Sequence, residues 1–239
     1  MMKYSKLGLL GIIMLIFVCE WLFLNRNYLP SLSVDGIQGL TSLTSSYAGY
    51  NYIGSHGTFY TLLFLSLLIQ YISEDKVQLL VRIKRKSFLL LNYKRVLFCA
   101  CCFSVLFSLV NVVFVTVFED HTLLMDSRFY IGSIISMILY IIFYFFVGSI
   151  FLLIETIISS KNMALLATFG LMTVWTFVTR YISIWTPVEN LVVFDYLFNN
   201  QLDLVKVGIH ILELGVVIGA IVTITIINFK DKDVLNEKS

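Results

Sequence analysis

Ionisable side chains within apolar segments are the residues of this sequence best suited to chemistry. Lys206, His210 and Glu213 follow one another at spacings of four and three in the last apolar segment, so a helix would place them on one face. They could neutralise one another in the membrane, or they could line a substrate path. Glu20, beside Trp21 in the first apolar segment, could reach the interface or join the same path. Neither the four-residue spacing from Lys206 to His210 nor the three-residue spacing from His210 to Glu213 is typical of a metal site.

The sequence lacks the constellations that indicate catalysis. A membrane-embedded hydrolase would need a nucleophile and a base on neighbouring helices. The three histidines are His56, His121 and His210, and the chain contains neither G-x-S-x-G nor H-E-x-x-H. None of the 13 glycines precedes a lysine, so a G-x-x-x-x-G-K-[ST] phosphate loop is excluded. We therefore expect no catalytic residue, no metal and no cofactor in this chain.

The elements that position these residues are membrane-spanning helices. The chain has 239 residues, of which 59% are hydrophobic and only 13% are charged, which is typical of an integral membrane protein. Six apolar stretches approach the roughly 20 residues that cross a bilayer. We expect a single all-α transmembrane domain over residues 1–239, with these six spans: Leu7–Leu24, Gly57–Ile72, Val96–Phe118, Phe129–Ile154, Met163–Ile184 and Val205–Phe229. The second stretch looks short and could begin earlier.

The distribution of positive charge predicts the orientation. Most of the 17 basic residues fall at the two ends of the chain and between the second and third spans. The alternate segments carry only Arg26, Arg128, Arg180 and Lys206. Lys and Arg favour the cytoplasmic side, so we expect a multi-pass protein of the cell membrane with both termini cytoplasmic. A net charge of +2, with basic residues beside apolar spans, indicates contact with lipid headgroups rather than nucleic acid.

The basic loop Lys76–Arg95 joins the second and third spans. A helix over Lys76–Lys86 would be amphipathic and lie on the membrane surface, with acidic residues at its N-terminus, where the helix dipole favours them. Such a helix could dock a cytoplasmic partner, or the loop could only set topology and bind anionic lipid. The docking residues would be Glu74, Asp75, Arg82, Lys84, Arg85 and Lys86.

Residues before the last span indicate a second short helix, on the outer side. Thr186, Pro187 and Glu189 fit an N-cap, a first helical position and a capping-box acid. Apolar residues follow, so the segment could re-enter the outer leaflet while packed on protein. Alternatively, aromatic residues including Trp185 could hold it at the interface. Gly215 and Gly219 in the last span have a small-xxx-small spacing, which permits close helix packing within or between chains.

These patterns together resemble small permease subunits of ABC-2-type transporters. The resemblance is carried by LLVRIKRKSFLLLNYKRVLF after an apolar span, six spans in total, an apolar outer segment before the sixth, and the closing NFKDKDVL. It implies that the loop between spans two and three contains a coupling helix and that the outer segment is a short re-entrant helix. It also implies two copies of a separate subunit that binds ATP and magnesium, and a second permease copy or a sister permease.

The substrate class that the resemblance implies is an amphipathic or apolar peptide, lipid or drug. Export of an antimicrobial peptide, or self-immunity to one, is the preferred function. The scarcity of charges in the spans agrees with such a substrate. The alternative is a non-transporting membrane receptor or immunity protein that binds a peptide directly, since fold alone does not assign function.

Overall fold

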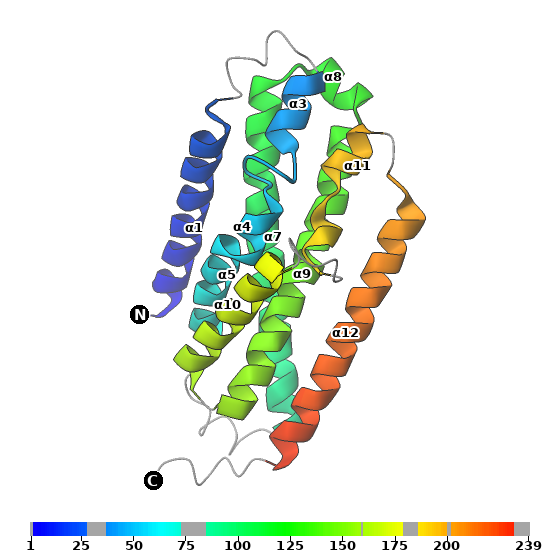
Figure 1. Ribbon diagram of the computed structural model, residues 1–239. Coiled ribbons are helices and arrows are strands. Elements are labelled where there is room, and N and C mark those ends of the chain that lie inside the picture. The colour runs from blue at the N-terminus through cyan, green and yellow to red at the C-terminus, as the bar shows by residue number, and fades with distance from the viewer. Residues whose placement is uncertain are drawn as a thin grey trace.

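The computed structural model describes residues 2–27, 37–72, 85–158, 160–178, 186–199 and 202–231, and these ranges contain helices and no strands. Six helical segments are long and apolar enough to cross a membrane. This confirms the prediction of an all-helical, multi-pass membrane protein. The helices form an elongated bundle, shown in Figure 1. We call the end that carries α8 (His121–Asp126) the α8 end, and the end at which α7 begins the Arg85 end.

Four of the crossings are uninterrupted helices. At about 1.5 Å per residue, each exceeds the roughly 30 Å of a bilayer's hydrocarbon core. Their apolar side chains suit the lipid environment, and the backbone polar groups inside each helix are paired within that helix. These helices are α1 (Met2–Asn25), α7 (Arg85–Phe118), α9 (Phe129–Ile158) and α12 (Leu204–Asp231).

The second and fifth crossings are assembled from shorter pieces. The second comprises α3 (Ile37–Thr44), α4 (Ile53–Gly57) and α5 (Phe59–Tyr71). In the fifth, α10 (Lys161–Val178) ends near the middle of the bundle, and residues 186–199 continue along α9 towards the α8 end (Figure 1). That 186–199 segment contains a single 3-10 turn, Glu189–Leu191, and α11 (Phe194–Phe198).

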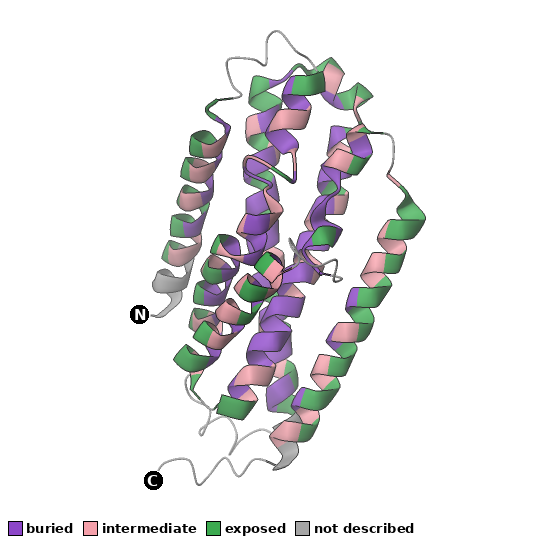
Figure 2. Ribbon diagram, viewed as in Figure 1, coloured by how far each residue is buried: buried purple, intermediate pink, exposed green. Residues whose placement is uncertain are grey.

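Helix α9 is the centre of the bundle. It contacts α5, α7, α8, α10, α11 and α12, and 61% of its span is buried, against 11% for α12 and 22% for α1 (Figure 2). Aromatic side chains fill the space between α1, α5, α7 and α9. The Phe17 ring, for example, lies 5.1 Å from Phe103 and 5.4 Å from Phe107. The less buried helices are at the periphery, where apolar surface can face lipid.

The third crossing begins 11 residues earlier than expected. Residues 85–95, predicted as part of a basic loop, form the first turns of α7. The buried residues of this stretch recur at helical spacing. They are Phe88, Leu89, Tyr93 and Val96, together with the polar Asn92. Lys94 projects from the exposed side of this stretch. The burial of one face therefore makes a polar-looking stretch helical.

The second crossing also begins earlier than Gly57, as its short apolar run suggested. The chain from Ile37 folds back into the bundle, and Leu40, Leu43 and Tyr50 are fully buried there. The polar sequence of this region would also suit a loop outside the bundle. In the part that the structure describes, it is a packed element.

Candidate functional site

The helix of the second crossing breaks at Thr58. This residue, at φ −123° and ψ −92°, separates α4 from α5. Hydroxyl groups satisfy the carbonyls that the break leaves: Thr58 Oγ1 donates to Gly54 O at 2.8 Å, and Thr61 Oγ1 donates to His56 O at 2.6 Å. Threonine side chains of this kind allow an interrupted helix to exist in a membrane protein.

The two interrupted crossings are joined to each other at three levels. Towards the Arg85 end, the Lys161 ammonium at the start of α10 donates to the carbonyl of Ile72, just after α5, at 3.2 Å. At the break, Gly57 lies against Thr176 so closely that a Cβ atom would overlap the threonine side chain. The third level, towards the α8 end, is a carboxylate in α11.

That carboxylate belongs to Asp195. Its Oδ1 accepts a hydrogen bond from Ser45 Oγ at 3.1 Å, and its Oδ2 accepts one from the backbone N–H of Ser46 at 2.8 Å. These bonds cross 149 and 150 residues of sequence. A charged acceptor makes such bonds stronger than neutral ones. The 186–199 segment is therefore fastened to the first part of the second crossing.

A buried polar centre lies beside the break. His56, in the last turn of α4, is fully buried. Its Nδ1 forms a 2.9 Å hydrogen bond with the Tyr144 hydroxyl of α9, and its ring stacks on Tyr140 at 4.6 Å and 14°. Within the part of the chain that the structure describes, its Nε2 has no hydrogen-bond partner. A buried, unpaired imidazole nitrogen is costly, so it marks this centre as a candidate site.

Tyrosines surround this centre and supply further polar groups. The Tyr60 hydroxyl donates to the carbonyl of Tyr50 at 3.0 Å, and the Tyr50 hydroxyl donates to that of Phe107 at 3.3 Å. Glu20 of α1 lies beside the Tyr60 hydroxyl, and its Oε2 is buried without a partner among the described residues. From the sequence, Glu20 could reach the membrane interface or line a substrate path. The structure places its carboxylate against the second crossing.

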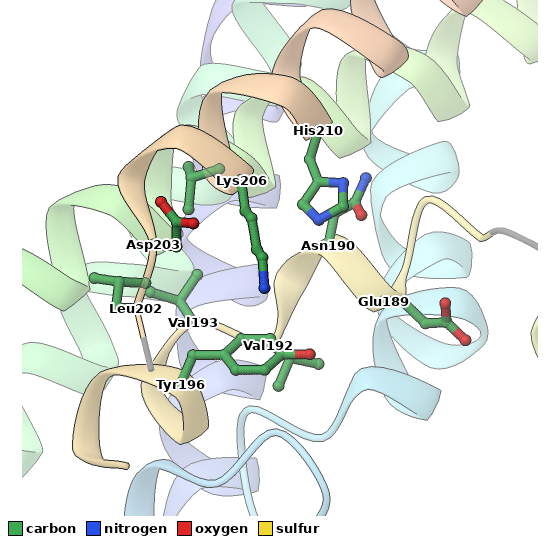
Figure 3. A pocket seen from close by; sticks show the side chains of 10 residues that line it. Glu189, Asn190, Val192, Val193, Tyr196, Leu202, Asp203, Lys206 and His210 are labelled. Carbon is green, nitrogen blue, oxygen red and sulfur yellow. The ribbon is translucent and has the colours of Figure 1, made fainter. Parts of the chain in front are cut away.

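A cleft of about 560 Å³ lies between the 186–199 segment and the first turns of α12 (Figure 3). We call it the α12 cleft. Its wall combines apolar residues with ionisable and amide groups. It is lined by Glu189, Asn190, Val192, Val193, Tyr196, Leu202, Asp203, Lys206, Val207 and His210. Its volume is within the range of about 300 to 1,000 Å³ that is usual for small-molecule sites.

The structure brings together only part of the ionisable trio predicted in the last span. His210 Nδ1 and Glu213 Oε2 are 3.2 Å apart, as the i, i+3 spacing indicated. Lys206 instead extends from α12 towards Tyr196, across the cleft (Figure 3). No ion pair or hydrogen bond of its ammonium occurs in the described ranges. Within this trio, the contact therefore joins His210 and Glu213 and omits Lys206.

The predicted helix start at Pro187 is wrong in its details. Pro187 and Val188 form a turn, and the 3-10 turn begins at Glu189 with Val188 in the cap position. The Thr186 hydroxyl makes no capping bond and has no partner in the part that the structure describes. Burial of Val188 and Leu191 against the bundle competes with the local capping pattern. Glu189 is exposed at the cleft.

The structure gives less information on the other predicted residues. Among the described residues, a Cβ atom on Gly215 or Gly219 would meet no atom within 4 Å, so neither glycine packs closely against that part of the chain. Arg85 and Lys86 belong to the first turn of α7. Five further residues lie outside the described ranges, and the docking helix stays a prediction: Glu74, Asp75, Arg82, Lys84 and Trp185.

The sequence reasoning missed the residues that carry this site. His56 was noted only as one of three histidines, although Gly54, Gly57 and Thr58 around it signal a break in an apolar run. Asn190 and Asp195 carried no local signal, since their partners come from the tertiary fold. Among the described residues, no group of three or more His, Cys, Asp and Glu side chains could hold a metal ion.

Comparison of this chain with models of protein families, with curated proteins and with solved structures found no match. The arrangement of the helices and the two polar features, the His56 centre and the α12 cleft, are therefore the basis for a functional proposal.

Proposed function

We propose that this chain is the membrane-spanning permease subunit of a transporter that moves an amphipathic or apolar compound, such as a peptide, lipid or drug, across the cell membrane. ATP, with magnesium, would be hydrolysed by a separate subunit present in two copies. A second copy of this chain or a sister permease would complete the assembly. The permease class rests on the sequence resemblance, and the structure adds an independent argument for transport.

The observation that supports transport most is the pair of interrupted crossings. Discontinuous helices are common at the substrate sites of transporters, where irregular backbone lines a cavity or packs on protein. Here Thr58 breaks one crossing, and the other includes the 186–199 segment, whose described backbone is a 3-10 turn and a short α-helix rather than one continuous helix. The buried His56 centre adjoins the break. A protein serving only as a membrane anchor would not need polar groups at this depth.

The chemistry around the break agrees with an amphipathic substrate. Phe17, Tyr60 and Phe107 present aromatic faces around His56 and Tyr50, and few charged groups accompany them. In a conformation that opens the bundle here, these aromatic side chains would contact the apolar surface of a substrate, while a small number of hydroxyl and imidazole groups would bind its polar atoms. A highly charged solute would find too few counter-charges here.

The first experiment is purification of the tagged full-length chain from its native membrane in mild detergent. Mass spectrometry would identify co-purifying chains, and ATP hydrolysis by the complex would be measured. We expect a stoichiometric partner with a phosphate-binding loop. A chain that is intact and folded but carries no such partner, and hydrolyses no ATP, contradicts the permease proposal.

A matched pair of variants would connect ATP use to the interrupted crossings. Gly57→Leu would force the second and fifth crossings apart at the break, because even a Cβ overlaps Thr176 there. Gly170→Leu in α10 faces open space and is the control. We expect the first variant to retain the partner subunit and lose transport-coupled ATPase activity, and the second to retain both. Equal transport-coupled ATPase activity of the two variants would show that the packing at the break has no role in transport.

A receptor or immunity protein that binds a peptide directly is the second candidate. The α12 cleft supports it, because this site is open at the surface of the bundle and needs no path across the membrane. Binding of a peptide with unchanged affinity after removal of any ATPase partner, together with absence of transport in vesicles, would favour this function.

A further inference from the structure

We propose that the α12 cleft binds an amphipathic molecule through a singly charged anionic head group, a phosphate ester or a carboxylate, held by Lys206 and Asn190. The apolar chain would lie along Val192, Val193 and Val207. This inference concerns ligand chemistry in the cleft and is independent of whether the chain works with an ATPase.

Lys206 supplies the positive charge. Its side chain crosses the cleft towards Val192 and Tyr196 (Figure 3), and within the described ranges it takes part in no ion pair. It stands in the first turn of α12, where the positive end of the helix dipole also favours an anion. A lysine in this position gains most from a ligand that brings the negative charge.

Asn190 supplies a second, independent donor. Only 8% of its surface is exposed, and its Nδ2 has no hydrogen-bond partner among the described residues. Asn190 lines the cleft from the 3-10 turn, opposite α12 (Figure 3). A buried amide N–H without an acceptor is unfavourable, so an oxygen of the ligand in the cleft would remove this cost.

The acidic groups near the cleft are either engaged or directed elsewhere. Asp203 Oδ1 accepts the backbone N–H of Val205 at 2.9 Å, at the start of α12. Glu213 pairs with His210, and the Glu189 carboxylate points away from Lys206 (Figure 3). These acids still repel a highly charged anion through space. The cleft therefore favours a single negative charge, or a zwitterion, over a multiply charged head.

Valine side chains in the wall of the cleft would contact the apolar tail of the ligand. The valines at 192 and 193 come from the 186–199 segment, while Val207 comes from α12, so the tail would lie between the two elements. The cleft adjoins a span whose surface is largely exposed, which gives an amphipathic molecule access from the lipid side. A molecule with a head but no tail would forgo this apolar contact and bind weakly.

The test is calorimetric titration of the full-length protein at about pH 5, where a phosphate monoester carries a single negative charge because its second pKa is about 6. The detergent is a neutral maltoside, and three probes are used below their micelle-forming concentrations. These probes are octyl phosphate, octyltrimethylammonium and inorganic phosphate. We expect octyl phosphate to bind tightest. Octyltrimethylammonium binding tighter would overturn the proposal, and so would inorganic phosphate binding equally well, since the tail would then have no role.

Variants assign the binding to the cleft. Lys206→Ala should weaken octyl phosphate by about 10- to 100-fold, the usual effect of a hydrogen bond to a charged group, and Lys206→Arg should retain most of the affinity. Asn190→Asp, which replaces the donor with a carboxylate of the same shape, should weaken it further than tenfold.

The matched control is Lys94→Ala, which removes the same side chain from the exposed side of α7. Equal loss in this control and in Lys206→Ala would show attraction to surface charge only and would refute the site. Thermal unfolding of each variant establishes that it is folded. Retained binding in folded Lys206→Ala and Asn190→Asp would also refute the proposal.

Discussion

Substitution of Gly57 by alanine tests whether the two interrupted crossings pack directly on each other. The added Cβ would overlap the Thr176 side chain. That threonine is buried and its Oγ1 donates to Met172 O at 2.8 Å, so it cannot move away without losing a bond. Overpacking of this kind costs about 1 to 3 kcal/mol. The gain in helix propensity from glycine to alanine is at most about 1 kcal/mol, and we expect a net loss.

The second variant of the cycle is Thr176→Gly, which removes all three overlapping atoms, the Oγ1, Cβ and Cγ2 of that threonine. In that background, Gly57→Ala should cost close to nothing, which gives a coupling energy of about 1 to 2 kcal/mol between neighbouring sites. The assay is reversible unfolding in mixed micelles of a mild detergent and dodecyl sulfate, followed by circular dichroism. Gly170→Ala, where a Cβ meets no atom within 4 Å, should be neutral or slightly stabilising.

Two results would refute this reasoning. One is a Gly57→Ala variant as stable as Gly170→Ala, since a direct contact at the break would then be absent. The other is an equal loss of stability from Gly57→Ala with and without Thr176, because the cost would then arise within α4 itself.

Three further predictions concern other contacts. Tyr144→Phe should destabilise the protein by about 1 to 3 kcal/mol in the same unfolding assay, because His56 Nδ1 loses its partner in a fully buried place; an unchanged midpoint would contradict this contact. Burial raises the pKa of Glu119 from 4.5 to about 6. Its folded form therefore binds more protons between those values, and stability should fall as pH rises through this window; Glu119→Gln should remove that part of the pH dependence. Asp195→Ala should speed hydrogen exchange around Ser46 and α11, because two bonds to the carboxylate are lost; unchanged exchange there would show that these bonds do not fasten the segment.

The number and approximate position of the crossings could be predicted from sequence because they depend on local composition. A run such as Phe129–Ile154 is apolar on all sides, and an apolar helix of that length is more stable across a bilayer than in water. The structure extends it only to Ile158. The expected start at Val96 was less accurate, because the stretch before it mixes charges with residues that become buried only in the folded bundle.

The site could not be predicted because its contacts connect distant parts of the chain. The Asp195 carboxylate is satisfied by Ser45 and Ser46 across about 150 residues, and nothing near any of them in the sequence signals the pairing. The capping pattern at Thr186 failed for a related reason. Local capping contributes about 1 kcal/mol, and burying several apolar side chains of the 186–199 segment contributes more.

The composition of the interrupted crossings has a consequence for how the protein enters the membrane. The segments Ile53–Tyr71 and Lys161–Val178 are the least hydrophobic of the six, so each would partition into lipid less readily than its neighbours during synthesis. Two of their polar groups are paired across the bundle: Lys161 donates to the carbonyl of Ile72, and His56 shares a hydrogen bond with Tyr144 of α9. We expect these two segments to complete their insertion only after α9 is in place, with the strongly apolar helices acting as an assembly platform within the bilayer.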